Sequence, residues 1–226
     1  MEVLLKAINL ILSGDRELLF ISLTSLKFSI NSLIIASGIS IPLALYLGMN
    51  RFSGKKLILV LMNSLMALPT VVIGLLVYSF LSRSGPLGEL GLLFTPVGII
   101  IGQTILIVPI LISMVYASVS TMNSSIIETL STLGATPLYS YYIVFKEMKI
   151  SILTALLAGF GRVIGEVGVS MMLGGNIRWY TRTITTTIAL ESGKGDFELA
   201  LALGLVLIVI SFLLNFLIHL AVNFEK

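Results

Sequence analysis

Cysteine is missing from this chain of 226 residues, and histidine occurs once, at position 219. Without cysteine the chain has no disulfides, thiolate metal sites, iron–sulfur clusters or thiol catalysis. A single imidazole cannot form a histidine cluster around a metal ion. The sequence therefore excludes the classes of redox protein and metalloprotein whose sites are built from these side chains.

Charge is also scarce. Asp, Glu, Lys and Arg make up 11% of the residues, against roughly a quarter in an ordinary soluble domain. Hydrophobic residues make up 57%, and the mean hydropathy is +1.08. A chain of this size cannot bury so many apolar side chains around one core, so we expect a membrane protein. The net charge of +3, without a run of Lys or Arg, gives no support for a nucleic-acid partner.

Several apolar segments are long enough to cross a bilayer as helices, which takes about 20 residues. A shorter apolar segment, residues 2–13, has polar residues at helical spacing and precedes Gly14 and Asp15, which is typical of an interfacial helix. The predicted fold class is an all-α integral membrane protein, with an interfacial N-terminal helix at 1–19 and a membrane domain at 20–222. The five predicted spans run over roughly 20–48, 57–80, 96–119, 151–173 and 198–222.

Proline and polar residues occur inside these spans. Pro69 and Pro109 each remove a backbone N–H in the middle of an apolar segment, and Asn63 and Gln103 lie nearby in sequence. A proline frees a carbonyl and bends the helix, which is tolerated in a membrane where neighbouring protein or water satisfies the freed group. These positions favour a bundle with a polar interior.

Charge bias does not orient the chain. Lys and Arg are equally numerous on the two sides of the predicted topology. Only the density of Arg51, Lys55 and Lys56 in one short loop favours that side as cytoplasmic.

The connection at 120–150 has a pattern of its own. Apolar residues recur at helical spacing up to Gly134 and again after Pro137. Glycine ends helices, Thr136 can cap the next one, and proline suits a first helical position. The pattern predicts two short amphipathic helices joined by a tight turn, which would form either a membrane-surface hairpin or a docking knob for a soluble partner.

The residues of this connection resemble a known family. The stretch 128–135, ETLSTLGA, is similar to the EAA loop of binding-protein-dependent ABC importer permeases. The stretches 158–168, 171–177, 181–183 and 189–197 resemble the oxyanion branch of that family, which includes permeases for molybdate, sulfate and especially tungstate. Many members have Leu-Pro about twelve residues past the loop glycine, where this chain has Lys146 and Glu147. Tungstate-type permeases share this departure.

The resemblance implies the fold of a type I importer transmembrane subunit. It implies a homodimer that binds two ABC ATPase subunits, an extracytoplasmic oxyanion-binding protein and membrane lipid, with alternating access as the mechanism. The EAA loop is cytoplasmic in this family, which would place the protein in a prokaryotic inner membrane with its N-terminus outside and its C-terminus in the cytoplasm. The residues expected to couple to the ATPase are Glu128, Leu133, Gly134, Ala135 and Thr136.

The chain is not expected to be an enzyme by itself. No phosphate-binding GxxxxGK[ST] pattern occurs in it. We expect no cofactor on this chain, with ATP and Mg²⁺ held by the partner ATPase.

The fourth predicted span contains two charges, Arg162 and Glu166. At i and i+4 they share one helical face and can neutralise each other. A charge at the centre of a membrane costs about 2.5–3.5 kcal/mol on insertion scales, so the pair should face protein or water. Either it fixes the bundle, or it lies near the translocation path. The candidate residues for the path or the bundle core are Arg162, Gly165, Glu166, Gly168 and Met172.

The largest outer connection, 174–197, contains a glycine turn, cations and a run of threonines. Hydroxyl donors beside cations could guide an oxyanion or dock a binding protein. The alternative interpretation of the whole stretch is a polar loop between two spans, without such a role. The stretch 183–190 could also re-enter the membrane. The candidate residues are Gly174, Gly175, Asn176, Arg178 and Arg182.

Other functions remain open at this point. The substrate could be molybdate or sulfate instead of tungstate. A secondary anion transporter could use Arg162 and Glu166 as a coupling pair, although no inverted repeat is found among five spans. A membrane scaffold without transport would leave the predicted knob without a purpose.

Overall fold

The computed structural model describes residues 2–122, 129–130 and 132–223. The described part of the chain is built of helices and connecting turns, without a β-strand, which confirms the all-α class. Three helices are long and apolar enough to cross a membrane: α2 (Arg16–Met49), α5 (Pro96–Thr121) and α11 (Phe197–Asn223). The number of spans rises to five if each of two bent helix pairs counts as one span.

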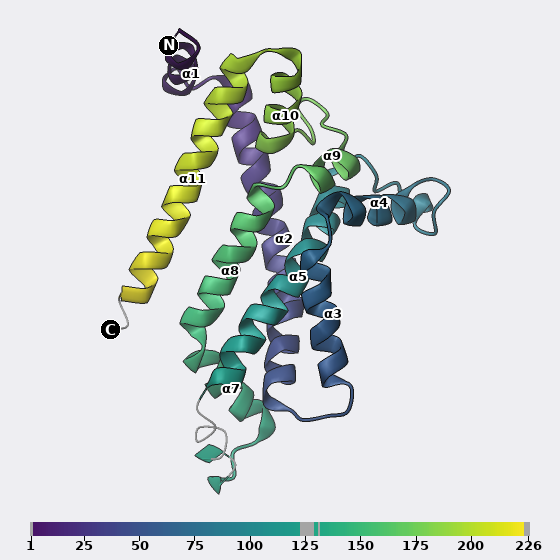
Figure 1. Ribbon diagram of the computed structural model, residues 1–226, viewed down its shortest axis with the longest axis vertical. Helices are drawn as coiled ribbons and strands as arrows, with labels where there is room; N and C mark the ends of the chain where they lie inside the picture. Colours follow the sequence, from purple (N-terminus) through teal and green to yellow (C-terminus); the bar gives the residue numbers. More distant parts are fainter. Residues whose placement is uncertain (1, 123–128, 131, 224–226) are drawn as a thin grey trace.

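Helices α2 and α5 pack along their length and form the centre of the bundle (Figure 1). Their core side chains include Ala36 and Ala44 of α2 and Ile107 and Leu111 of α5. Helix α8 (Lys149–Ile164) packs against both, and α7 (Pro137–Glu147) joins them at one end.

The second predicted span, 57–80, is not one helix. It divides into α3 (Lys55–Ala67) and α4 (Thr70–Leu81), which meet at 104°. Pro69 has no N–H to donate and restricts Leu68 to an extended conformation, with ψ 138°. The predicted bend at this proline is therefore confirmed, but it is sharp enough for α4 to project sideways from the bundle toward the short 3-10 helix η1 (Gly88–Leu90) (Figure 1).

The fourth predicted span, 151–173, is also broken. Helix α8 ends at Ile164, and α9 (Gly168–Gly174) continues at an angle of 60°. Pro109, in contrast, lies inside the continuous helix α5. The breaks therefore occur in the second and the fourth predicted spans, and the fourth contains the pair of membrane charges.

The N-terminal helix α1 (Glu2–Leu12) is present as predicted and packs against α11. Gly14 has φ +64°, and the carboxylate of Asp15 accepts hydrogen bonds from the backbone N–H of Glu17 and Leu18 at the start of α2. Lys6 Nζ donates to Glu198 Oε1 at 2.7 Å, and this contact raises the pKa of Lys6. Helix α1 is thus attached to α11, a contact that the sequence pattern did not predict.

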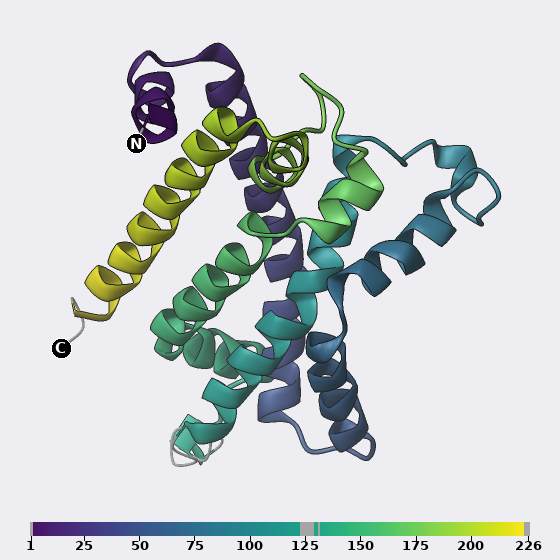
Figure 2. The ribbon, with the colours of Figure 1, turned by 45° about the horizontal axis from the view of Figure 1, so that its top comes forward.

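The outer connection contains another helix, α10 (Ile184–Lys194), which packs mainly against α11 and also contacts α2. Figure 2 shows α10 close to the first turns of α2. Helices α1 and α10 lie at one end of the bundle, and α7 and the α2–α3 connection lie at the other (Figure 1).

Candidate functional site

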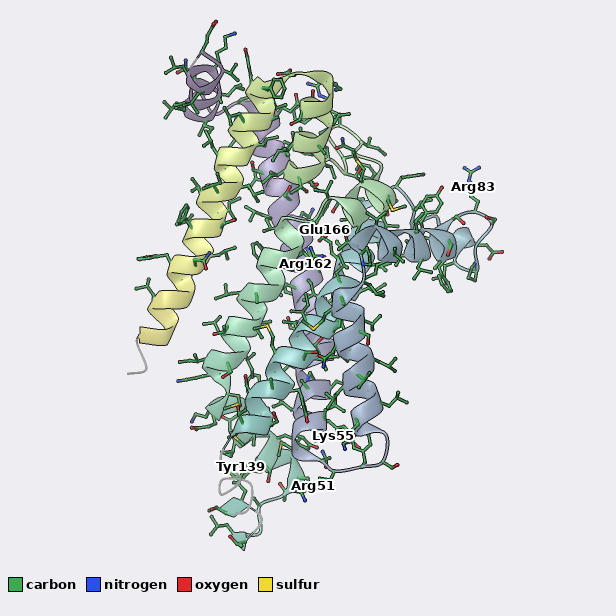
Figure 3. The ribbon with its side chains drawn as sticks, viewed as in Figure 1. Arg51, Lys55, Arg83, Tyr139, Arg162 and Glu166 are labelled. Carbon is green, nitrogen blue, oxygen red and sulfur yellow. The ribbon has the colours of Figure 1, made fainter. Side chains whose placement is uncertain are left out.

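The two charges of the fourth predicted span meet at its break. Arg162 Nη1 donates to Glu166 Oε2 at 2.9 Å, so the predicted i,i+4 pair is formed. The side chain of Glu166 is 3% exposed and that of Arg162 is 42% exposed. Both residues lie near the middle of the molecule, where α8 ends (Figure 3). The carboxylate is therefore enclosed by protein while the guanidinium reaches the surface of the single chain.

Glu166 connects three helices. Besides binding Arg162 of α8, its carboxylate accepts a hydrogen bond from the N–H of Val169 in the first turn of α9, at 3.3 Å. Its backbone carbonyl accepts from Thr185 Oγ1 of α10 at 2.7 Å. A carboxylate near a helix N-terminus satisfies an N–H that the helix leaves unpaired. The break between α8 and α9 is therefore held by one residue.

A buried polar cluster surrounds this break. Ser32 Oγ donates to Gln103 Oε1 at 2.9 Å, and Gln103 Nε2 reaches Ser170 Oγ at 3.5 Å. The backbone N–H of Ile184 donates to Ser25 Oγ at 2.7 Å. The cluster joins α2, α5, α9 and α10. The side chains that meet there are those of Ser25, Ser29, Gln103, Val163, Ile164, Glu166, Ser170, Thr183 and Thr185.

Glu166, Gln103 and the threonines of this cluster stand out in the sequence, but Ser25, Ser29 and Ser32 of α2 were not predicted as members of a polar site. A signal was present, because Ser22, Ser25, Ser29 and Ser32 recur at steps of three and four, which places them on one helical face. That spacing could have identified the polar side of α2.

A strip of small residues at the end of α8, formed by Ala158, Gly161 and Gly165, is exposed, as is Arg162 beside it. A Cβ added to Gly161 would meet no atom within 4 Å outside its own helix, and one at Gly165 would approach only the Gly161 carbonyl oxygen, at 3.7 Å. Within the described residues, no helix packs on this strip.

Gly168 and Met172 contact α4. A Cβ on Gly168 would lie 3.1 Å from Val71 Cγ2 and 3.3 Å from Thr70 Oγ1. Met172 Sδ lies 2.9 Å from the position that a Cβ on Gly74 would take. These two predicted residues therefore form the crossing of α9 with α4.

The outer arginines are engaged in ion pairs. Arg178 Nε donates to Glu17 Oε1 at 2.9 Å, and Arg182 Nη1 lies 3.3 Å from the same oxygen. The contact with Glu17 raises the pKa of Arg178. Glu191 lies 4.0 Å from Arg182 and 3.0 Å from Lys194. Arg178 and Arg182, which the sequence suggested as guides for an oxyanion, are thus paired with carboxylates. Glu17 was not predicted as a partner of these cations.

The glycine turn and the threonines stabilise the outer connection internally. Gly175 has φ +67° and Asn176 has φ +50°, and Thr186 Oγ1 donates to Asn176 Oδ1 at 2.9 Å. A Cβ on Gly174 would lie 2.5 Å from Ile99 Cδ1. The threonines at 181, 183, 185, 186 and 187 are all buried. They were expected as donors lining an outer loop, and the structure instead places them inside the fold.

The predicted coupling residues surround a tight turn. Gly134 has φ +68°, and a Cβ there would meet no atom within 4 Å. Thr136 Oγ1 accepts a hydrogen bond from the N–H of Tyr139 at 3.4 Å, so it caps α7, which begins at Pro137 as predicted. Leu133 is 78% exposed, and Ala135 N–H donates to the Leu130 carbonyl at 3.0 Å. Glu128 lies outside the described residues.

Comparison with known proteins gives consistent matches. Residues 40–224 match the family described as binding-protein-dependent transport system inner membrane component. The chain is 39% identical to the tungstate uptake system permease protein TupB of Peptoclostridium acidaminophilum over 94% of this chain and 93% of that protein. It is 38% identical to TupB of Campylobacter jejuni over 95% and 90%.

A third relative comes from an archaeon. The chain is 37% identical to a probable anion ABC transporter permease protein of Haloferax volcanii, over 87% of this chain and 88% of that protein. The family match and the bent membrane helices agree in placing the protein in a membrane. This chain therefore belongs to the binding-protein-dependent transport system inner membrane components, the ABC importer permeases that its EAA-like segment and its oxyanion-branch motifs resemble.

Proposed function

We propose that this chain is the permease subunit of an ATP-driven importer that takes up tungstate through a homodimeric pore. The similarity to two tungstate permeases over more than nine-tenths of the chain carries the proposal. Two copies of the chain assemble with two ABC ATPase subunits and receive the anion from an extracytoplasmic binding protein. The N-terminus lies outside and the C-terminus in the cytoplasm.

The uncovered strip on α8 supports a second copy. Gly161 and Gly165 leave room for a close neighbour, and small residues at this spacing allow membrane helices to approach each other. Helix α4 also exposes Val71, Leu75 and Leu76. A two-fold partner would cover these apolar side chains and enclose a path between two copies of α8.

Arg162 provides the positive charge on this path. Its guanidinium is the part of the ion pair that remains exposed, and a guanidinium matches the oxygen atoms of a tetrahedral anion with planar donors. Glu166 has a positioning role, because it fixes the direction of Arg162 and joins α8 to α9 and α10. Since the pair is neutral overall, it does not hold the anion tightly, which suits a residue on a path.

The segment from Leu133 to Thr136 receives the force of the ATPase. Leu133 projects into solvent beside a glycine that has space around it. We assign ATP and Mg²⁺ to the partner subunit, where hydrolysis moves the permease helices. The rigid helix α7 follows this turn directly and leads into α8, so a push on the turn reaches the broken span as a rigid-body movement.

Uptake by purified components tests this function. Vesicles containing the permease and its ATPase, with binding protein outside and ATP inside, should accumulate tungstate, and vesicles without ATP should not. Accumulation without ATP or ATPase would show a secondary transporter or a channel and would overturn the proposal.

A further inference from the structure

Three cations of the α2–α3 connection line a pocket that has no carboxylate among its described lining residues. Arg51, Lys55 and Lys56 line a cavity of about 440 Å³ together with Phe52 and Tyr116. Lys55 Nζ lies 5.1 Å from the centre of the Tyr116 ring and donates to the Asn50 carbonyl at 3.2 Å. Within the described part of the chain, none of the three cations has an ion-pair partner, in contrast to Arg162, Arg178 and Arg182. The pocket is therefore suited to an anion.

An apolar groove lies at the same end of the bundle. It has a volume of about 1080 Å³ and runs between the last turns of α2 and helix α7. Leu138 is 81% exposed and Tyr142 is 57% exposed, although both are large and apolar or aromatic. The groove is lined by Ile41, Pro42, Leu45, Tyr46, Thr136, Leu138, Tyr139, Tyr141, Tyr142 and Phe145.

The pocket and the groove are neighbours. The Tyr46 ring of the groove contacts the Phe52 ring of the pocket, with centroids 5.7 Å apart. Asn50 Nδ2 donates to Tyr141 Oη at 2.6 Å, which fixes the groove wall of α7 against the start of the basic connection. Figure 3 shows Arg51, Lys55 and Tyr139 at the same end of the molecule, and Arg83 far from them beyond α4. A cationic pocket thus adjoins an open apolar groove.

We propose that this composite surface binds one anionic phospholipid of the cytoplasmic leaflet. The phosphate headgroup lies among Arg51, Lys55 and Lys56, and an acyl chain lies in the groove beside Tyr139 and Tyr142. Charge complementarity selects an anionic lipid over a zwitterionic one, because basic residues at the membrane surface attract anionic headgroups. The groove selects a lipid over free phosphate, because only a lipid also covers the apolar side chains. The site stands on these contacts and does not depend on which anion is transported.

Native mass spectrometry of the purified complex tests the site. With equal amounts of phosphatidylglycerol and phosphatidylcholine in the detergent, the wild type should retain phosphatidylglycerol in preference. The combined variant Arg51→Gln, Lys55→Gln, Lys56→Gln should lose about tenfold or more of this preference. Arg83→Gln, which removes an exposed cation far from the pocket, should keep it. Equal retention of both lipids by the wild type, or an equal loss in Arg83→Gln, would overturn the proposal.

The groove is tested separately. Tyr139→Gln with Tyr142→Gln leaves the three cations in place and should weaken the retention of phosphatidylglycerol. Inorganic phosphate at the same concentration should not displace the lipid from the wild type. Displacement by phosphate, or unchanged retention in the groove variant, would identify a simple ion site and contradict the lipid assignment.

Discussion

At the scale of single residues, Glu166 holds the Arg162 side chain in place and joins the two sides of the break between α8 and α9. Its buried carboxylate binds both Arg162 and the first turn of α9, so removing its charge leaves Arg162 without compensation. The substitution also weakens the hydrogen bonds that the carboxylate accepts from Arg162 Nη1 and the Val169 N–H, and hydrogen bonds to charged groups contribute about 1.5–3 kcal/mol. We expect Glu166→Gln to lower the thermal stability of the purified permease in detergent, and Glu89→Gln, at an exposed position in η1, to leave it unchanged. Equal stability of the two variants would show that the pair does not hold the break.

Arg162 should affect both transport and stability. Its side chain is 42% exposed, so its loss opens no cavity in the core, but it leaves the buried carboxylate of Glu166 without its charged partner. A hydrogen bond to a charged group contributes about 1.5–3 kcal/mol, so Arg162→Gln should lower tungstate transport by about tenfold or more. The measurement is the initial uptake rate in vesicles, with Arg83→Gln as the control. Uptake at the wild-type rate would place Arg162 off the path and support the purely structural interpretation.

Glycine at position 102 is required by packing. A Cβ there would lie 2.4 Å from both Leu173 Cδ1 and Val169 Cγ1, so α9 could not approach α5 as closely. Overpacking of a core costs about 1–3 kcal/mol, and Gly102→Ala should destabilise the protein accordingly. At Gly204 of α11 a Cβ would meet nothing within 4 Å, and Gly204→Ala should stabilise by about 0.5–1 kcal/mol. Thermal unfolding of the two variants should shift in opposite directions.

At the scale of elements, the sequence predicted the helices better than their breaks. Hydropathy located all the long segments, and the cap at Thr136 and the turn at Gly14 follow from local residue chemistry. The angle at Pro69 was not predictable, because Pro109 has the same chemistry and lies inside the unbroken helix α5. The two prolines differ in their tertiary environment, because helix α4, which follows Pro69, packs against α9.

The burial of the threonines could not be predicted either. Thr185 and Thr187 lie in a polar stretch between two spans, which is typical of an exposed loop. The Thr185 hydroxyl donates to the backbone carbonyl of Glu166, and the Thr187 hydroxyl donates to that of Thr183. Both buried hydroxyls therefore have hydrogen-bond partners inside the fold. The residues of the site were partly predictable, since the Arg162–Glu166 pair follows from helical spacing, whereas the pairing of Arg178 with Glu17 joins positions 161 residues apart.

The turn before α7 should control the association with the ATPase. Gly134 and Gly195 both have positive φ, +68° and +82°, and free space around the α-carbon, but they lie at opposite ends of the bundle. Gly134→Arg should abolish co-purification of the ATPase, because a large cation there holds the surfaces apart. Gly195→Arg carries the same strain and charge and should keep the ATPase bound. Co-purification with Gly134→Arg would exclude this turn as the contact.

At the scale of the whole molecule, the absence of cysteine allows the two-fold contact to be measured directly. A single cysteine introduced at Ala158, on the uncovered strip of α8, should cross-link two copies through a short thiol-reactive reagent. Leu213→Cys, on α11, is also at an exposed position but lies away from the strip and should remain monomeric on a denaturing gel. Cross-linking of Leu213→Cys but not of Ala158→Cys would contradict this two-fold contact and indicate a different interface.

The net charge of +3 is divided between paired and unpaired cations. Arg178, Arg182 and Lys194 are paired with Glu17 and Glu191, and Arg162 is paired with Glu166. Arg51, Lys55 and Lys56, which have no ion-pair partner within the described residues, lie together at the α2–α3 connection, at the end that we assign to the cytoplasm. Positive charge in this short connection agrees with the general bias of membrane proteins and supports the proposed orientation, which the count of Lys and Arg does not decide.

The substrate is the central claim, and one competition experiment tests it most directly. Vesicles containing the complete importer should take up tungstate in an ATP-dependent manner when tungstate, molybdate and sulfate are present at equal concentrations. We predict that tungstate accumulates first and that excess sulfate does not slow it. Uptake of sulfate alone, or of molybdate ahead of tungstate, would contradict the assignment.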